Sequence, residues 1–575
     1  MTNQLKLSIG QYSDKGLKPQ NQDFHGALIP KEPQLSLKGA AFALADGIST
    51  SSVSQIASAA AVKSFLDDYF CTSDAWSVRT AAERVLLAAN SWLHSQTRRS
   101  EYRFDKDRGY VCTFSALVVK ASTAHLFHVG DTRIYRLHDN ALEQMTKDHR
   151  LWVSQEESYL SRALGIDEHL EIDYQALSIK PGDTFLLATD GVYEHADTQF
   201  ILATIREHAT ALDTAAQRIV EHALERGSGD NLTAQILRID QVPGAEHAEL
   251  QLQAERLPLP PMPEPRTPFD GYEIVRELHA TSRSHVFLAV DNDSGERVVL
   301  KTPSIDLADD PNYLERFLLE EWIARRINSA HVLKAVPPTR KRAYLYTAME
   351  YIEGQTLRQW LIDNPRPEIE TVRGIVEQIA RGLRAFHRME MLHQDLRPEN
   401  IMIDQNGTVK IIDFGATRVA GIIEANTNQP ESILGTALYS APEYFLGLSG
   451  TERSDQFSLG VICYQMLSGR FPYGTDVAKC RTAKAQQRLS YDSVLDEERE
   501  IPAWVDEALK KATHPSPEKR YDDLSEFIYD LRHPNRAFLN KTRPPLIERN
   551  PVLFWQGVSA LLAGALMYLL ASPPM

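Results

Sequence analysis

The sequence predicts a multidomain α+β protein. At 575 residues the chain is too long for one hydrophobic core, because a domain usually holds about 100–200 residues. Strand-like and helical patterns are interspersed without a regular strand–helix–strand order, which favours antiparallel sheets with helices packed on them. Residues 258–268 contain six prolines. Because proline fixes φ and lacks an N–H donor, we expect an extended linker over residues 241–268 that divides the chain in two.

The first half carries the patterns of a sheet covered by helices. Residues 116–120, 125–129 and 133–137 are short apolar and β-branched runs separated by turn residues, which predicts strands. Alanine and leucine recur every three or four positions in residues 54–68 and 79–98, which predicts helices.

The second half begins with strands and continues with helices. Residues 272–277, 286–290 and 297–300 have the strand pattern, and residues 372–389 and 456–467 have the spacing of amphipathic helices. The predicted sheet of this half therefore precedes its helices.

The composition excludes some classes of function. The net charge is -15 and the pI is about 5.7, so no basic face is available for a phosphate backbone and no nucleic-acid partner is expected. The four cysteines form no CxxC pair and have no zinc-ligand spacing with histidine, which fits a reduced compartment. The N-terminal residues lack an apolar run of signal-peptide length, so we expect no secretion signal.

Residues 552–570 form a run without a charged side chain near the C-terminus. A helix needs about 20 apolar residues to cross a bilayer, and Trp555 lies near one end as interfacial anchors do. We therefore expect a transmembrane helix over residues 552–571 after a basic juxtamembrane segment, residues 536–551. This anchor would hold both halves in the cytoplasm at the inner membrane. The alternative is a buried C-terminal helix of the last domain.

Aspartates beside glycine or asparagine recur in the first half. They lie in the segments NQD (21–23), ADG (45–47), TDG (189–191) and GDN (229–231). A phosphate ester resists hydroxide because both are negative, and two divalent cations can neutralise the ester and lower the pKa of a bound water. Mg²⁺ and Mn²⁺ prefer carboxylate oxygen. One such dipeptide is a common turn, but the ordered set indicates a two-metal site.

Two further segments, HVGDTRIYRL (128–137) and MTKDH (145–149), lie between these aspartates. With this order and spacing, residues 1–240 resemble the type 2C, metal-dependent protein phosphatases, which implies an α-β-β-α sandwich. A metal-activated water, not a side chain, would be the nucleophile, so we expect the Cys112 thiol to be packed. The resemblance implies these metal ligands: Asp46 bridging both metals with the Gly47 carbonyl nearby, Asp190 and Asp230 on one metal, Asp23 on the other, and Asp131 at a third, weaker site.

Two positions depart from the phosphatase pattern. Lys18 stands where arginine is usual, so the phosphate-binding group keeps its charge but loses the bidentate fork. Gln22 replaces a common glutamate and loses a charge. The alternative to an active phosphatase is an inactive regulatory module.

Residues 393–415, HQDLRPENIMIDQNGTVKIIDFG, carry the pattern of phosphoryl transfer from a nucleotide. This chemistry needs neutralised phosphates, a group at the attacking hydroxyl and metal ligands. The chain supplies candidates in the expected order: Lys301 for the α- and β-phosphates, Glu320 (or Glu321) as its ion-pair partner, Asp395 at the substrate hydroxyl, and Asn400 and Asp413 for Mg²⁺.

With TALYSAPE (436–443), Asp455 and Arg520 added, residues 269–535 resemble the eukaryotic-like Ser/Thr protein kinases of bacterial type. The resemblance implies a bilobal fold, ATP with Mg²⁺ as cofactors, and Asp455 as a brace of the catalytic loop. Arg397 and Thr436 favour Ser/Thr over Tyr acceptors. The nucleotide would be contacted by the following residues: Lys301, Met349, Glu350, Ile352, Asn400 and Asp413.

Two features depart from the kinase pattern. His279, Thr281 and Ser284 occupy positions where the family places the glycines that let backbone N–H groups close over phosphate. Gln394 replaces the arginine that would meet an activation-loop phosphate, so phosphorylation of that loop is not expected to be the main switch. Thr427 and Ser432 are still candidate phosphosites.

The two patterns together predict a bifunctional enzyme. Its second half would phosphorylate Ser/Thr of proteins with ATP and Mg²⁺. Its first half would hydrolyse phospho-Ser/Thr with two Mn²⁺ or Mg²⁺, with its own kinase half among the candidate substrates. The alternative is an active phosphatase tethered to a pseudokinase that serves as a nucleotide sensor or scaffold.

Overall fold

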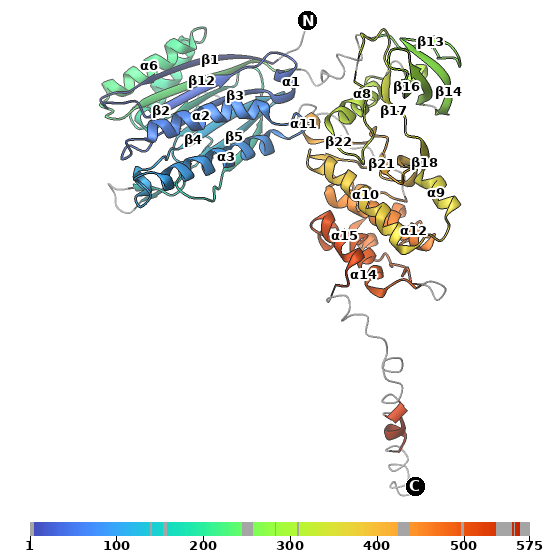
Figure 1. Ribbon diagram of the computed structural model, residues 1–575. Coiled ribbons are helices and arrows are strands. Elements are labelled where there is room, and N and C mark those ends of the chain that lie inside the picture. The colour runs from blue at the N-terminus through green and yellow to red at the C-terminus, as the bar shows by residue number, and fades with distance from the viewer. Residues whose placement is uncertain are drawn as a thin grey trace.

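The computed structural model of the chain has two domains, built from residues 6–241 and 268–532 (Figure 1). The structure describes residues 5–138, 141–152, 158–243, 257–281, 283–307, 310–337, 339–423, 438–495, 500–535, 555–556 and 558–563.

Two antiparallel sheets of five strands form the centre of the first domain. Strand β3 shows how the sequence positions them, because its successive side chains point to opposite faces. Ala41, Ala43 and Ala45 face the helices, whereas Phe42 and Leu44 face the other sheet. The strand order of the first sheet is β1 (Lys6–Asp14), β12 (Leu232–Gln241), β11 (Thr184–Ala188), β6 (Arg133–His138), β7 (Ala141–Gln144). The strand order of the second sheet is β10 (Asp173–Ser178), β5 (Thr123–Val129), β4 (Phe114–Lys120), β3 (Ala40–Asp46), β2 (Asp23–Leu28).

Helices cover both outer faces of this pair of sheets. Helices α2 (Ser54–Cys71) and α3 (Val78–Arg99) pack on the β2–β5 sheet, and α5 (Thr198–Glu207) and α6 (Leu212–Glu225) pack on the other. The predicted α-β-β-α sandwich is therefore confirmed. The shorter elements are α1 (Gln34–Lys38), α4 (Asp190–Tyr193), β8 (Arg150–Trp152) and β9 (Ser158–Leu160).

The second domain has two lobes. Its first lobe is an antiparallel sheet, β13 (Pro268–Phe269), β14 (Tyr272–Ala280), β15 (Ser284–Asp291), β16 (Arg297–Pro303) and β17 (Thr347–Glu350), with helix α8 (Pro311–Arg326) packed near it. The second lobe is mainly helical: α9 (Leu357–Asp363), α10 (Ile369–His387), α11 (Ala420–Ile423), α12 (Glu452–Ser468), α13 (Ala483–Gln486), α14 (Ala503–Ala512) and α15 (Leu524–Arg532). The remaining short strands form two small sheets: β18 (Gly354–Thr356), β20 (Ile401–Asp404) and β21 (Val409–Ile411) in one, and β19 (Met391–Leu392) and β22 (Arg418–Val419) in the other.

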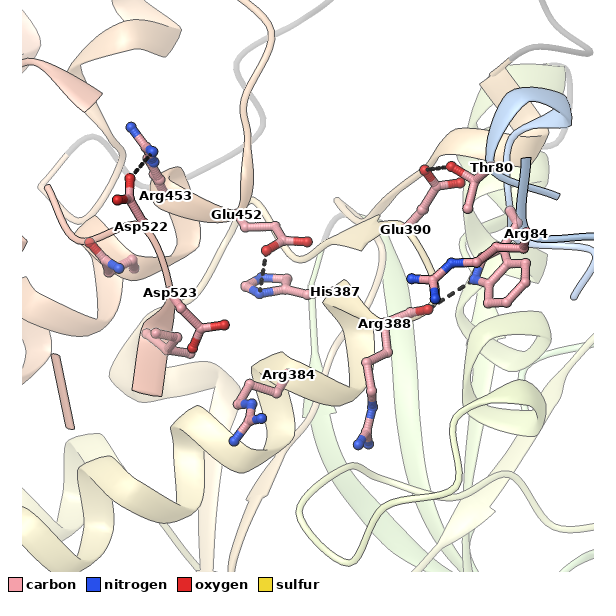
Figure 2. Close-up of a pocket in the computed structure, with 13 residues that line it drawn as sticks. Thr80, Arg84, Arg384, His387, Arg388, Glu390, Glu452, Arg453, Asp522 and Asp523 are labelled. Carbon is pink, nitrogen blue, oxygen red and sulfur yellow. Dashed lines mark hydrogen bonds and ion pairs between the residues drawn. The ribbon is translucent and has the colours of Figure 1, made fainter. Parts of the chain in front are cut away.

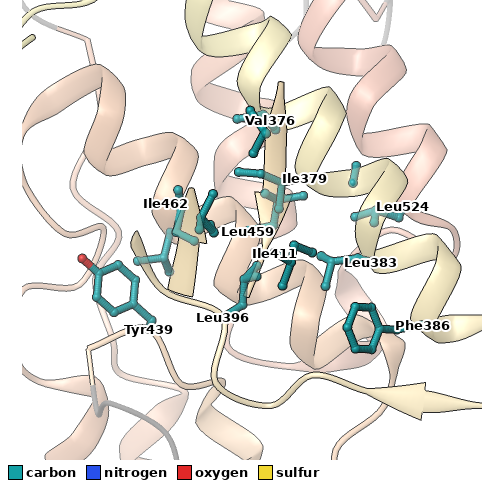
Figure 3. Packing of buried hydrophobic residues seen from close by; sticks show 14 of the residues in the cluster. Val376, Ile379, Leu383, Phe386, Leu396, Ile411, Tyr439, Leu459, Ile462 and Leu524 are labelled. Atoms are coloured by element: carbon teal, nitrogen blue, oxygen red, sulfur yellow. The ribbon is translucent and has the colours of Figure 1, made fainter. Parts of the chain in front are cut away.

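Helix α10 forms the centre of the helical lobe. Its apolar side chains recur every three or four residues and so share one face. Figure 3 shows Val376, Ile379, Leu383 and Phe386 of α10 packed with side chains of three other elements. These are Leu459 and Ile462 of α12, Ile411 of β21 and Leu524 of α15. The predicted bilobal arrangement is confirmed.

The described part of the proline-rich linker lies against the second domain. The Pro258 carbonyl accepts a hydrogen bond from Leu345 N at 2.9 Å. Leu257 and Leu259 pack against the core of that domain. Residues 257–259 therefore have fixed contacts.

The prediction of a transmembrane helix over residues 552–571 is wrong. In the part of the chain that the structure describes, no helix combines the length and apolar character that a bilayer crossing requires. Residues 555–556 and 558–563 are the part of this segment that the structure describes. The juxtamembrane segment 536–551 lies outside the described residues. The cytoplasmic location expected for the two domains stays a prediction.

Candidate active sites

Asp23 and Asp46 lie directly opposite each other on the paired strands β2 and β3. Asp23 is buried, and its Oδ2 accepts hydrogen bonds from Thr189 Oγ1 at 3.0 Å and Thr233 Oγ1 at 2.7 Å. Its Oδ1 is buried without a partner among the described residues. Burial raises the pKa of Asp23 to about 6.

More carboxylates converge on this pair. Burial, followed by repulsion from Asp23, Asp190 and Asp131, raises the pKa of Asp46 well above its usual range. Burial also raises the pKa of Asp190 to about 7, and Asp131 adds to this shift. Such a group of oxygen donors is stabilised in its charged form when a cation lies among them.

Arg150, on β8, contacts this group and was not among the predicted site residues. Its Nε lies 2.6 Å from Asp131 Oδ2, its Nη2 lies 2.8 Å from Asp190 Oδ2, and its Nη1 lies 3.0 Å from Glu194 Oε1. The guanidinium therefore supplies positive charge among the aspartates. Its only sequence signal is its place directly after MTKDH.

Asp230 lies next to the predicted phosphate-binding residue. Lys18 Nζ is 3.2 Å from Asp230 Oδ1 and 3.3 Å from Ser49 Oγ. Gly47 is required by packing, because an added Cβ would lie 2.8 Å from the Ser54 Cβ. The Cys112 thiol is buried, and burial raises its pKa; the prediction that it is packed is confirmed.

Gln22 has a role that its amide explains. Its Nε2 donates to the Ser51 carbonyl at 2.7 Å and to Ser54 Oγ at 2.6 Å, both buried. A glutamate could not donate these bonds when ionised. Gln22 therefore holds the loop that follows Asp46 and Gly47.

The aspartates suit a divalent cation by their chemistry. Among the residues that the structure describes, no group of three or more His, Cys, Asp or Glu side chains has the arrangement needed to hold a metal ion. The raised pKa values of Asp46 and Asp190 and the unpartnered Oδ1 of Asp23 nevertheless fit an all-oxygen site for a hard cation.

In the second domain, Lys301 and Glu320 form an ion pair in which Glu320 is buried and Lys301 is partly exposed. Lys301 Nζ lies 2.6 Å from Glu320 Oε1 and 2.7 Å from Oε2. Burial alone would lower the pKa of Lys301, but the carboxylates of Glu320 and Asp413 outweigh it and raise the net pKa. Glu321 instead binds Arg342, with Nη1 2.6 Å from its Oε2, and also contacts Arg325. The alternative register is thereby excluded.

The catalytic-loop candidates lie together. Asn400 Nδ2 donates to the Asp395 carbonyl at 2.9 Å and to its Oδ2 at 3.1 Å. Arg397 Nε lies 3.9 Å from Asp395 Oδ2. Asp413 has a φ of 66° and its Oδ1 accepts from Gly415 N at 3.3 Å. Phe414 beside it is buried in the same cluster as Ile323 of α8.

Asp455 holds the start of the catalytic loop by hydrogen bonds to its backbone. Its Oδ2 accepts from His393 N at 2.9 Å and its Oδ1 from Gln394 N at 3.0 Å. His387 Nε2 lies 2.9 Å from Asp455 Oδ2. Burial opposes ionisation of Asp455, but the bond with His387 outweighs it and lowers the pKa. Arg520 forms a separate buried pair with Glu443, with Nη2 2.7 Å from Oε2.

Three predicted nucleotide contacts follow one another where the lobes join. Met349 and Ile352 are buried. The Glu350 carboxylate binds Lys410 Nζ at 2.7 Å, so this side chain is committed to the protein. Thr427, Ser432 and Thr436 lie outside the described residues.

Thr281 closes the hairpin between β14 and β15 where glycines were absent. Its Oγ1 accepts hydrogen bonds from Arg283 N at 3.2 Å and Ser284 N at 3.0 Å. The Arg283 carbonyl accepts from Ser304 N at 2.8 Å and also contacts the Tyr313 hydroxyl. Two amides that glycine-rich loops turn toward phosphate are therefore occupied by a side chain.

Comparison with known proteins matches both domains. The protein kinase domain model covers residues 272–528 and the protein phosphatase 2C model covers residues 18–227. Serine/threonine-protein kinase PrkC of Bacillus subtilis is 29% identical over 262 residues, 45% of this chain and 40% of that protein. Serine/threonine-protein kinase PknL of Mycobacterium tuberculosis is 32% identical over 265 residues, 45% of this chain and 64% of that protein. The chain thus spans less than two thirds of the length of these relatives.

Two groups of solved structures are similar to parts of this chain. The catalytic domain of serine threonine protein phosphatase PstP, in complex with 2 manganese ions, is 25% identical over 41% of this chain and 100% of that chain, with a TM-score of 0.35. The PknI kinase domain of Mycobacterium tuberculosis is 24% identical over 47% of this chain and 98% of that chain, with a TM-score of 0.36. From the family models, residues 18–227 are a protein phosphatase 2C domain and residues 272–528 are a protein kinase domain, joined in one chain.

Proposed function

We propose that the chain is a bifunctional enzyme that phosphorylates Ser/Thr residues of proteins with ATP and hydrolyses phospho-Ser/Thr in proteins. The observation that carries the kinase activity is the closed Lys301–Glu320 ion pair, 2.6 Å long, next to an Asp395 that is hydrogen-bonded to Asn400. Kinases need this pair in place for transfer.

Each kinase residue has one task in this proposal. Lys301 holds the α- and β-phosphates, and Asp395 accepts the proton of the substrate hydroxyl. Asn400 and Asp413 would hold Mg²⁺. Met349 and Ile352 provide buried apolar surface for the adenine ring.

The phosphatase proposal rests on the converging carboxylates. Asp23, Asp46, Asp190 and Asp230 would hold two Mn²⁺ or Mg²⁺ ions, with Asp131 at a third position. Bound cations neutralise the phosphate ester and lower the pKa of water. Lys18, beside Asp230, binds the substrate phosphate by its charge.

The kinase activity is tested by labelling with ATP that carries a radioactive γ-phosphate. We expect the full chain with Asp190→Asn, which silences the phosphatase, to label a protein acceptor with Mg²⁺. Asp395→Asn should abolish the labelling, whereas Asp363→Asn, an exposed aspartate on α9, should leave it unchanged. Labelling that persists in Asp395→Asn would contradict the assignment.

A phosphatase tethered to a pseudokinase is the second candidate. It is favoured by Thr281, whose hydroxyl occupies two amides of the nucleotide loop. It predicts nucleotide binding without labelling of any acceptor in the same assay.

The phosphatase activity is tested with the full chain, Mn²⁺ and a phosphothreonine peptide. We expect Asp46→Asn to lower turnover at least a hundredfold, because the bridging ligand loses its charge. Asp68→Asn, an exposed aspartate on α2, is the matched control. Equal rates in Asp46→Asn and wild type would rule out the two-metal reading.

A further inference from the structure

The two domains contact each other through residues 73–80 of the phosphatase domain, which comprise the loop after α2 and the first turn of α3. Figure 2 shows this contact beside a pocket between the domains. Trp76 Nε1 donates to the Arg388 carbonyl at 2.9 Å. Ser77 N donates to Glu390 Oε2 at 2.6 Å, and Thr80 Oγ1 donates to Glu390 Oε1 at 2.7 Å.

Glu390 forms hydrogen bonds with residues of both domains. Its carboxylate caps the first turn of α3, where a negative charge is favourable. Its backbone carbonyl accepts from Ala420 N at 3.1 Å, at the start of α11. It has a φ of 53° and lies three residues before His393, where the catalytic loop begins. One residue therefore connects the phosphatase domain, the catalytic loop and the segment that follows Asp413.

The same phosphatase loop reaches helix α8. Ala75 is fully buried, and it belongs to the apolar cluster of the kinase domain together with Trp322 and Ile323. Asp74 Oδ2 lies 3.2 Å from Arg326 Nη2, at the end of α8. Helix α8 carries Glu320, so the loop contacts the element that positions the partner of Lys301.

A second contact lies nearby. Helix α1 of the phosphatase domain lies against α11 of the kinase domain. The phosphatase domain thus contacts three kinase elements: the end of α8, the approach to the catalytic loop, and the helix after Asp413.

We propose that the phosphatase domain is a docked activator of the kinase domain. The proposal rests on the kinase activity proposed above. In the docked arrangement the Lys301–Glu320 pair is closed and Phe414 is buried. Gln394 cannot bind an activation-loop phosphate as an arginine would, so docking supplies the contacts that hold the catalytic loop and α8 in place.

The interface between the phosphatase and kinase domains has the features of one that can open and close. A cavity of about 370 Å³ lies beside it, and its walls carry charged residues of both domains, among them Arg84, Arg384 and Glu452. Polar contacts between domains resemble those of transient complexes. A ligand or partner that separates the domains would lower kinase activity without touching the ATP site.

The test uses the full chain with Asp190→Asn. Ala75→Arg inserts a bulky charge into the buried contact, while Ala88→Arg places the same side chain at an exposed site on α3. We expect Ala75→Arg to lower kinase turnover at least fivefold and Ala88→Arg to leave it within twofold. Thr80→Val, which removes one bond to Glu390 without adding bulk, should lower turnover about threefold.

Two further measurements make the result decisive. With Asp190 restored, hydrolysis of a phosphopeptide by Ala75→Arg should match wild type within twofold, which shows that the phosphatase fold is intact. Hydrogen exchange at residues 319–326 and 388–392 should be faster in Ala75→Arg than in Ala88→Arg. Unchanged exchange, or unchanged or higher kinase turnover, overturns the proposal. If the parent chain shows no labelling, the proposed kinase function fails and the exchange result alone decides on docking.

Discussion

At the scale of single residues, Glu320 and Glu321 show that neighbouring positions on a helix face different partners. Glu320 binds Lys301 and Glu321 binds Arg342. We expect Glu320→Gln to lower kinase turnover more than tenfold with little change in melting temperature. Glu321→Gln should keep most of the turnover but destabilise the fold by roughly 2 kcal/mol, since it leaves two arginines without their partner. Thermal melting and the labelling assay separate the two effects, and the reverse pattern would contradict the register.

Arg150 leads to a second prediction at this scale. Without its guanidinium, Asp131 and Asp190 repel each other with no counter-charge. We expect Arg150→Met to lower the melting temperature of the phosphatase domain in chelator, and Mn²⁺ to raise it by more than in wild type. Arg136→Met, which breaks the pair with Asp183 at 2.7 Å, is the matched control and should respond to Mn²⁺ as wild type does. Equal Mn²⁺ shifts in all three chains would show that Arg150 does not compensate the aspartates.

At the scale of elements, the hairpin between β14 and β15 depends on a side chain. Thr281→Gly would free the amides of Arg283 and Ser284 and supply the flexibility that a phosphate-binding loop uses. We expect the KM for ATP to fall about threefold or more. Ser294→Gly, in the turn that follows β15, is the control and should leave the KM unchanged. A higher KM in Thr281→Gly would mean that the threonine itself helps to shape the nucleotide loop.

The elements that the sequence predicted are those with strong periodicity. The spacing of residues 116–120 and 125–129 predicted β4 and β5, and the alanine pattern predicted α2 and α3, because burial of one face imposes these periods. Arg150 could not be predicted, since its contacts with Asp131 and Asp190 arise from the fold and not from local spacing. The run at residues 552–570 was misread because apolar length alone does not specify a spanning helix.

Some residues of the two candidate sites could likewise be predicted from the sequence, and others could not. The aspartates and the kinase motif could be found from order and spacing, because the chemistry fixes residue types at turns and loop ends. The partner of Lys301 needed the structure, since Glu320 and Glu321 are one residue apart. The role of Glu390 could not be predicted from the sequence either, because its hydrogen-bond partners Ser77 and Thr80 lie in the other domain.

At the scale of the whole molecule, the two domains have separate hydrophobic cores. Among the described residues, Ala75 is the one phosphatase residue that belongs to a kinase cluster. We therefore expect two thermal transitions in the full chain. Mn²⁺ should raise only one of them, and a non-hydrolysable ATP analogue with Mg²⁺ should raise only the other, because each ligand binds one folded domain. Calorimetry checks this, and a single transition that both ligands shift would show one cooperative unit.

The bonding of Glu390 has an evolutionary consequence. Its carboxylate caps helix α3 of the phosphatase domain, and its backbone carbonyl accepts a hydrogen bond from Ala420 N at the start of α11 in the kinase domain. A substitution there is felt by two enzymes, so it can be compensated only by a change in the other domain. In natural variants of this chain, position 390 should therefore co-vary with positions 77 and 80, and the two halves should be inherited as a matched pair that cannot be exchanged freely between lineages.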